Sequence, residues 1–351
     1  MSNKRIAYLA GEIIKESSKL SKNSKRYGLF PIQNEESFEF MKKLEIIDWT
    51  DDEISYNDDI TDYTIKADDA QRKTIDRALA FSSGLDGIVI ENLALRLILE
   101  SSSLEDRCFF VRQLTNELVH SLTYNKFILA FKPIPEERSK IFEAIDTLPS
   151  LVKLTEWLEK YMASDLPFYC RMTAYVALEG IIFTAGIFCP IFYFRTKSMF
   201  KELIRANSMI IRDEGIHARF GISKILESLT LVSDLKEAKE NIKNIFKSGV
   251  SLAMDIADDM LEGGGSEELV PEKLKKYVEY VADFWLEQIG IDSIYGSENP
   301  YSWMESFGLQ EKSNFFETTP SYNLASIRHA LDWQKQVGWK KEETKFIESD
   351  F

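Results

Sequence analysis

Two of the three histidines in this chain stand three residues after a glutamate: Glu117 precedes His120, and Glu214 precedes His217. Positions i and i+3 share one face of a helix, so each pair can hold a metal ion from a single helix. The same spacing also arises on the wet side of amphipathic helices, where Glu and His are both common. The spacing alone therefore only suggests two ligand pairs.

The apolar surroundings of these acids favour a metal. Glu117 and His120 share a helical face with apolar residues, and Glu179 is the only charged residue in the range 172–194. Asp86 also lies within an apolar run. An ionised carboxylate buried without a partner is very costly, so such groups bind cations or take up protons. Four acids in apolar surroundings and two histidines thus lie on four separate helices.

The order of these residues repeats along the sequence. Asp86 precedes Glu117 by 31 residues, and Glu179 precedes Glu214 by 35, so an acid helix is twice followed by a Glu-x-x-His helix. Oxygen-rich ligation with one imidazole per ion suits iron or manganese, and the lack of thiolates argues against structural zinc. We therefore predict a dimetal site with the ligands Asp86, Glu117, His120, Glu179, Glu214 and His217.

The elements that position these ligands are predicted to be helices. Few stretches alternate with a period of two, and glycine and proline mostly mark boundaries, so we expect an all-α fold. We expect a flexible segment over 1–30, one helical domain over 31–310 and a tail over 311–351. The first helix should span 34–46, followed by an acidic connector at 51–62. The longer apolar-periodic segments are 67–101, 104–131, 151–162, 166–194, 198–228, 234–262 and 272–291.

Composition excludes several classes of function. The net charge of −14 repels phosphate, so we expect no binding to nucleic acid or to an anionic membrane. The apolar segment 172–194 is long enough to span a bilayer, but Glu179 and Pro190 argue for a buried core helix instead. The three cysteines have no metal-binding spacing, so we expect reduced thiols in a cytoplasmic protein without a signal peptide.

At these residues the protein resembles the small, radical-generating subunit of class I ribonucleotide reductase, over residues 30 to 317. Its motifs are closest to those of the eukaryotic and viral di-iron members. The resemblance implies a ferritin-like bundle with two iron ions per subunit, dimanganese or manganese–iron as alternatives, and dioxygen for activation. The shared motifs are Asp86-Gly87-Ile88-Val89, Glu91-Asn92-Leu93, Glu117-x-x-His120, Glu179-Gly180, Arg212-Asp213-Glu214-Gly215-x-His217 and Asn314-Phe315-Phe316-Glu317.

Tyr124 lies one helical turn beyond His120, so its phenol can face the metals. A core tyrosine on an amphipathic helix is the simpler explanation, but the resemblance implies that Tyr124 holds a stable radical. By the same resemblance, Phe183, Ile187 and Ile210 form the apolar wall that shields it. Packing alone would explain these three equally well.

The resemblance also implies a route for exporting the radical. Trp49 and Asp213 match the family residues near the site, with Asp213 joining Trp49 to His120, and Tyr322 matches a tail tyrosine. The acidic, Phe-ended segment 345–351 resembles the peptide with which small subunits dock on the large subunit. Segment 324–345 departs from the family, since it is more basic and aromatic than a plain flexible tail. A homodimer and a reductant or activating protein are further implied partners.

The function that follows is a small subunit of ribonucleoside-diphosphate reductase, which makes a radical that the large subunit uses to reduce ribonucleotides. The nucleotide site should lie elsewhere, since this sequence has no phosphate-binding glycine loop. Two alternatives remain. A substrate-oxidising di-iron oxidase or monooxygenase would need an open channel, and such bacterial enzymes carry Glu where this protein has Asp86. Iron storage in a ferritin-like cage would not need Tyr124.

Overall fold

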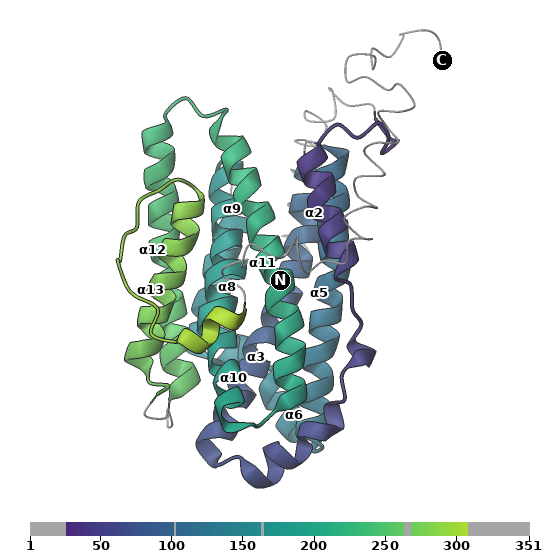
Figure 1. Ribbon diagram of the computed structural model, residues 1–351, viewed down its shortest axis with the longest axis vertical. Helices are drawn as coiled ribbons and strands as arrows, with labels where there is room; N and C mark the ends of the chain where they lie inside the picture. Colours follow the sequence, from purple (N-terminus) through teal and green to yellow (C-terminus); the bar gives the residue numbers. More distant parts are fainter. Residues whose placement is uncertain (1–25, 102, 163–164, 263–267, 308–351) are drawn as a thin grey trace. The chain divides into compact units, whose positions relative to one another are not determined.

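The computed structural model describes residues 26–101, 103–162, 165–262 and 268–307 (Figure 1). These residues form helices joined by turns, with no β-strand among them, which confirms the predicted all-α fold. They fall into two compact units, one made of 26–48 and 92–114 and the other of 49–91 and 115–307. The division of the protein at residues 30 and 310 stays a prediction. Tyr322, the motif at 314–317 and the segments 324–345 and 345–351 lie outside the described residues.

The smaller unit contains α2 (Glu35–Ile46), η5 (Leu93–Leu97), α4 (Ile98–Glu100) and the start of α5 (Leu104–Phe131). Asn34 caps α2 by accepting a hydrogen bond from the Ser37 backbone at 3.1 Å, as N-cap residues do. The Ser37 hydroxyl donates to Asp106 at 2.5 Å. Arg26 forms an ion pair with buried Glu105 at 2.9 Å. These contacts tie α2 to the first turns of α5.

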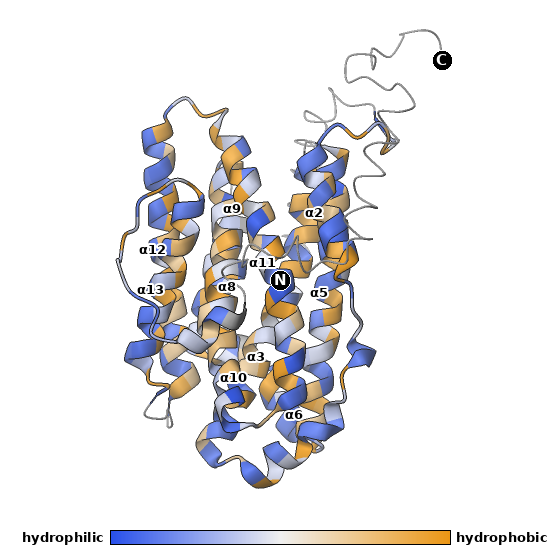
Figure 2. Ribbon diagram, in the orientation of Figure 1, coloured by the Kyte–Doolittle hydropathy of each residue, from blue (hydrophilic) through white to orange (hydrophobic). Residues whose placement is uncertain are grey.

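The larger unit holds most of the helices, and an apolar segment lies at its centre. In Figure 1, α9 lies between α11 and α12, and the contacts of the three helices agree. Figure 2 shows polar and apolar residues interspersed along α12 and α13, as expected for helices with one buried face. Its main helical segments are α3 (Asp69–Asn92), the rest of α5, α8 (Pro149–Met162), the continuous run of α9 (Phe168–Ala177), η6 (Leu178–Phe188) and α10 (Cys189–Tyr193), and then α11 (Lys201–Leu229), α12 (Leu235–Leu261) and α13 (Pro271–Gln288). Its short elements are η2 (Asp51–Glu53), η3 (Tyr56–Asp59), η4 (Asp62–Lys66), α6 (Pro135–Phe142), α7 (Ala144–Thr147), η7 (Phe194–Lys197) and η8 (Ser302–Phe307).

The apolar segment predicted at 166–194 is a core helix. Every residue from 172 to 194 is buried. Its middle part, η6, is a π-helix of 11 residues, whose i→i+5 hydrogen bonds are rare and often mark functional sites. Two helical stretches, Phe168–Lys197 and Asp69–Glu100, are long and apolar enough to cross a membrane, but the most apolar window of the first is 100% buried within the protein. That burial is the property of a core helix.

The acidic segment at 51–62 does more than connect two helices. It contains η2 and η3, and two of its acids are buried at the start of α11. Asp59 accepts a hydrogen bond from the Leu203 backbone at 2.7 Å, and Asp62 accepts one from the Phe200 backbone at 2.7 Å. The first N–H groups of a helix lack partners within the helix, so these carboxylates satisfy them. They therefore fix the start of the helix that carries Glu214 and His217.

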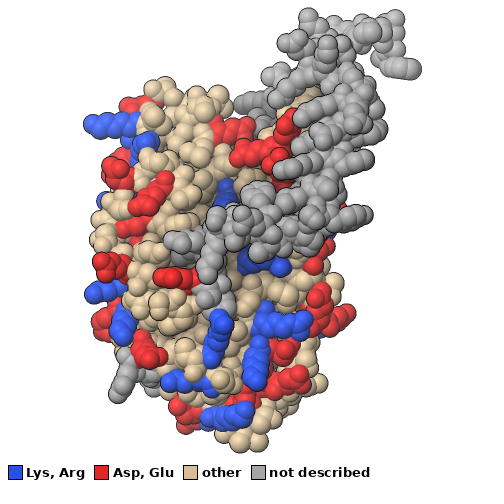
Figure 3. All heavy atoms as spheres, viewed as in Figure 1, with Lys and Arg blue, Asp and Glu red and all other residues tan. Residues whose placement is uncertain are grey.

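Charged side chains of both signs lie on the surface of the described residues. Figure 3 shows basic and acidic side chains interspersed over one face. All three cysteines are free thiols, with Cys170 and Cys189 buried and Cys108 half-buried.

Candidate metal centre

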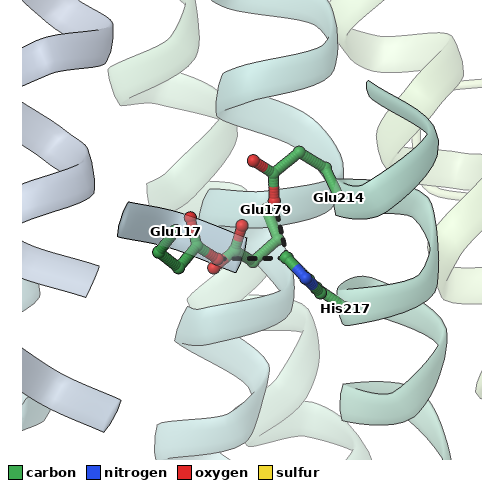
Figure 4. Close-up of side chains that lie close together, drawn as sticks. All are labelled: Glu117, Glu179, Glu214 and His217. Carbon is green, nitrogen blue, oxygen red and sulfur yellow. Dashed lines mark hydrogen bonds and ion pairs between the residues drawn. The ribbon is translucent and has the colours of Figure 1, made fainter. Parts of the chain in front are cut away.

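Three glutamates and a histidine meet in the interior of the larger unit. Glu117 comes from α5, Glu179 from the start of η6, and Glu214 and His217 from α11. All four are buried, and one ligand atom of each lies within 4.8 Å of the others. Figure 4 shows the four side chains pointing toward one another. Such a group of oxygen atoms with one imidazole can hold a metal ion.

Glu117 and Glu214 each lie between the two histidines. One carboxylate oxygen of Glu117 lies 3.3 Å from His120 Nδ1, and the other lies 3.1 Å from His217 Nδ1. Glu214 repeats this arrangement, with 3.2 Å to His120 Nδ1 and 2.9 Å to His217 Nδ1. A carboxylate shared in this way between two ligand groups has the position of a bridging ligand. Asp86, fully buried on α3, adjoins Glu117 and His120 closely enough for their charges to interact.

The far nitrogen of each histidine is held by a side-chain oxygen. His120 Nε2 lies 3.2 Å from Asp213 Oδ2, and His217 Nε2 lies 3.1 Å from Asn116 Oδ1. Each of these oxygens accepts a hydrogen bond, so Nε2 of both histidines carries a proton. Nδ1 of both rings then faces the glutamates. Outer hydrogen bonds of this kind orient metal-binding histidines and set their tautomer.

Burial and the contacts between the site residues shift their pKa values. Burial, followed by the charge of Glu117, raises the pKa of Asp86 well above its ordinary value. Burial and the charge of Glu214 likewise raise the pKa of Glu179. Burial opposes charge on His217, but contacts with Glu117 and Glu214 raise its pKa to about 9. These shifts show that the site favours added positive charge.

The donor set fits two divalent cations. Oδ2 of Asp86 and both carboxylate oxygens of Glu179 are buried and make no hydrogen bond of ordinary geometry among the described residues. Such oxygen atoms need a cation or a proton. Four carboxylates carry four negative charges when ionised, which two divalent ions would balance, and neither histidine needs to be charged.

Tyr124 lies on α5, one turn beyond His120, and is 1% exposed. Its hydroxyl donates a hydrogen bond to Asn207 Oδ1 at 3.0 Å. Burial, followed by the charge of Asp86, raises the pKa of Tyr124 well above its ordinary value, so the phenol is protonated. The three residues predicted to form an apolar wall, Phe183, Ile187 and Ile210, are all completely buried.

Trp49 and Asp213 are in direct contact. The Trp49 indole Nε1 donates to Asp213 Oδ2 at 2.7 Å, and its ring stacks on that of His120 with centroids 6.0 Å apart. Asn116 Nδ2 donates to the same Asp213 oxygen at 3.1 Å. Trp49, His120 and Asn116 thus share one acceptor atom.

Asn116 and Asn207 were not singled out from the sequence. Asn116 directly precedes Glu117, and Asn207 stands seven residues before Glu214 on the same helical face. The sequence could have indicated both residues, because each is an amide on the helix face that carries the predicted ligands. The sequence could not have indicated which side chain on another helix each amide contacts.

An all-α fold with a buried carboxylate and histidine cluster defines the ferritin-like dimetal-carboxylate proteins. The family model described as "Ribonucleotide reductase, small chain" matches residues 26–300, so this protein belongs to the ribonucleotide reductase small-chain family.

Individual relatives agree with this assignment. The ribonucleoside-diphosphate reductase small chain of Trypanosoma brucei brucei is 35% identical over 310 residues, which cover 88% of each protein. The protein of the same description from Nicotiana tabacum is 33% identical over 324 residues, which cover 91% of this sequence and 95% of its own. The Rnr4 homodimer structure from Saccharomyces cerevisiae is similar with a TM-score of 0.72 and 26% identity, over 84% of this protein and 93% of that one. The dimanganese(II)-NrdF structure from Streptococcus sanguinis has a TM-score of 0.72 at 18% identity, over 78% of this protein and 95% of that one, and shows the shared fold.

Proposed function

We propose that this protein, as the small subunit of a ribonucleoside-diphosphate reductase, generates a radical on Tyr124 and passes it to the large subunit. Relatives that bear the name ribonucleoside-diphosphate reductase small chain support the activity. The observation that carries the role of Tyr124 is its buried phenol, one turn from His120 and beside the carboxylate cluster. A phenol there is shielded from water and reductants.

The six predicted ligands would hold two ions, and iron is the metal that we propose. Asp86, Glu117 and His120 would bind one ion, with the other ligands on the second. Dimanganese and manganese–iron occupancy are the alternatives, because these metals share the ligand types. When bound and reduced, the ions supply, with dioxygen, the oxidising power that removes one electron from a phenol.

The protein's own residues then have separate tasks. Tyr124 gives up its hydroxyl hydrogen, and the surrounding core excludes water from the product. Asp213 accepts from Trp49 and His120, so it orients both rings. Trp49 would be the first residue on the way out, with Tyr322 in the tail as a later one. These assignments rest on the family resemblance and on the contacts given above.

We also propose a homodimer. The Rnr4 relative is described as one. A stripe of exposed leucines on α5 supports this, since Leu118 is 52%, Leu122 41% and Leu129 51% exposed. Exposed apolar side chains at helical spacing suit a protein interface. Sedimentation at micromolar concentration should give a dimer, and a monomer would contradict the proposal.

Docking on the large subunit is proposed for residues 345–351.

Tyr124→Phe tests the proposed function. The variant should bind metal normally, because the ring still fills its place and the phenol is not a proposed ligand. It should show no radical by electron paramagnetic resonance and no ribonucleotide reduction with the large subunit, because phenylalanine has no hydroxyl hydrogen to lose. Tyr277→Phe, which changes an equally buried tyrosine on α13, is the control and should be active.

Deletion of 345–351 should leave the radical intact and abolish turnover.

Active Tyr124→Phe protein would contradict the assignment. The oxidising equivalent would then be stored by the metals, and Tyr124 would be an ordinary core residue.

A further inference from the structure

Tyr124 shares its layer of the core with two other buried polar residues. Ser82 stands four residues before Asp86 on α3, and Asn207 stands seven before Glu214 on α11. Each is thus one or two helical turns from a predicted ligand, as Tyr124 is from His120. Ser82 and Asn207 are both 0% exposed. Because polar groups are costly to bury, their presence beside Tyr124 needs a reason.

Asn207 presents a fixed acceptor to the phenol. Its Nδ2 donates to the Leu203 carbonyl at 2.8 Å, while its Oδ1 accepts from the Tyr124 hydroxyl at 3.0 Å. Turning the amide over would set its oxygen against the Leu203 oxygen. The orientation is therefore locked, and the bond to Tyr124 exists only while the phenol keeps its hydrogen.

Ser82 has a buried hydroxyl. Its Oγ is buried and makes no hydrogen bond of ordinary geometry within the described residues. Ser82 lies one turn before Asp86 on α3, and Tyr124 lies one turn beyond His120 on α5, so the two hydroxyls lie in the same layer of the core. In agreement with this, Ser82 lowers the pKa of the Tyr124 phenol, against the larger effect of burial, which raises it. A serine hydroxyl rotates freely, so it can turn toward an oxygen that becomes a better acceptor.

Oxidation of Tyr124 changes the hydrogen-bonding role of its oxygen. The O–H bond breaks, and one electron and one proton leave the phenol to join the reduction of dioxygen to water. The phenoxyl oxygen left behind can only accept hydrogen bonds. It then faces the Asn207 oxygen, which is also an acceptor, so this contact turns from favourable to repulsive. A donor from Ser82 would stabilise the radical.

We propose that Asn207 and Ser82 tune Tyr124 in opposite directions: Asn207 holds the hydrogen of the reduced phenol, and Ser82 donates to the oxygen of the radical. This inference rests on the proposed function, because it assumes that Tyr124 is the oxidised residue. It adds two positioning residues that bind no metal. They set how easily the radical forms and how long it lasts.

Opposite shifts in two variants test the proposal. One neutral hydrogen bond corresponds to about fivefold in an equilibrium constant. In Asn207→Leu the ratio of radical to phenol, poised against the hexachloroiridate couple, should rise by about fivefold, since the phenol loses its acceptor. In Ser82→Ala the ratio should fall by about fivefold, since the radical loses its donor. Ser83→Ala, which changes a half-buried neighbour that bonds to Ala80, is the control.

High-field electron paramagnetic resonance gives a second readout that packing changes would not imitate. The wild-type radical, prepared in deuterated water, should show a coupling to one exchangeable deuteron. Ser82→Ala should remove that coupling and raise the largest g-value, Asn207→Leu should keep both unchanged, and Ser82→Thr should restore the wild-type spectrum because it keeps a hydroxyl.

The possible outcomes are distinct. Shifts of the same sign in both variants, or no shift in either, would overturn the tuning proposal while leaving Tyr124 as the radical site. Absence of any tyrosyl radical in the metal-loaded wild type would overturn the proposed function, and this inference with it.

Discussion

The indole N–H of Trp49 donates to Oδ2 of Asp213 at 2.7 Å, in the interior of the protein. The same oxygen lies 3.2 Å from His120 Nε2. One carboxylate oxygen thus links a tryptophan, near the start of the larger unit, to a predicted metal ligand. The link uses hydrogen bonds alone, so it can be broken without changing the ligands.

Trp49→Phe should separate radical formation from radical delivery. The phenylalanine ring can still pack beside His120, but the hydrogen bond to Asp213 is lost. Metal content should stay normal and the Tyr124 radical should form, whereas turnover with the large subunit should be lost or strongly reduced. Trp157→Phe, which removes an indole bonded to Ser248, is the control and should keep full turnover. Normal turnover in Trp49→Phe would exclude the route.

Asn116→Leu should weaken metal binding although Asn116 is not a ligand. His217 would lose the acceptor of its Nε2 proton, and Asp213 would lose one donor. Loss of such an outer hydrogen bond typically costs about 10–100-fold in metal affinity. Competition with a chelator would measure the change. Asn241→Leu on α12, which breaks a bond to Tyr169, should leave affinity unchanged.

Glu117→Ala and Glu214→Ala should each abolish stoichiometric loading at both ions, because each glutamate faces both histidines. Metal analysis after reconstitution and desalting is the measurement. Glu227→Ala, which removes an exposed glutamate near the end of α11, should bind two ions per subunit. Full occupancy in both ligand variants would refute the predicted ligand set.

Metal binding should release protons. In the metal-free protein the pKa values of Asp86, Glu179, His120 and His217 are all raised, so protons compete with a metal for these groups. Divalent ions require ionised carboxylates and neutral imidazoles, so loading should release protons. Affinity should therefore fall as pH falls, because protons compete for the site. Calorimetry in two buffers of different ionisation enthalpy would count them, and a count near zero would contradict the pKa shifts.

The sequence predicted those features of the site that depend on spacing within one helix. Glu117 and His120 share a face because they are three residues apart, and the helix bounds at 104–131 were predicted as observed. The i→i+5 bonding of η6 was not predictable, because a segment that is apolar on every side has no polar face from which to read a period, and Glu179 alone does not make one.

Contacts between helices could not be predicted from the sequence either. Asn207 reaches Tyr124 only because α11 lies beside α5, and Asp59 meets the start of α11 across 144 positions of sequence. Such pairs depend on how helices pack, and spacing within one helix does not encode packing. The short helices α6 and α7 were not predicted, since few apolar residues mark them.

The backbone next to the predicted ligand Glu179 is held by a distant helix through Gly180. The indole of Trp285 on α13 donates to the Gly180 carbonyl at 2.9 Å, and a β-carbon at Gly180 would lie 2.5 Å from the indole nitrogen. No side chain fits there while the indole remains. These two positions should therefore coevolve: a lineage that gains a larger residue at position 180 would need a smaller one at 285, and an alignment of family members should show the pair changing together.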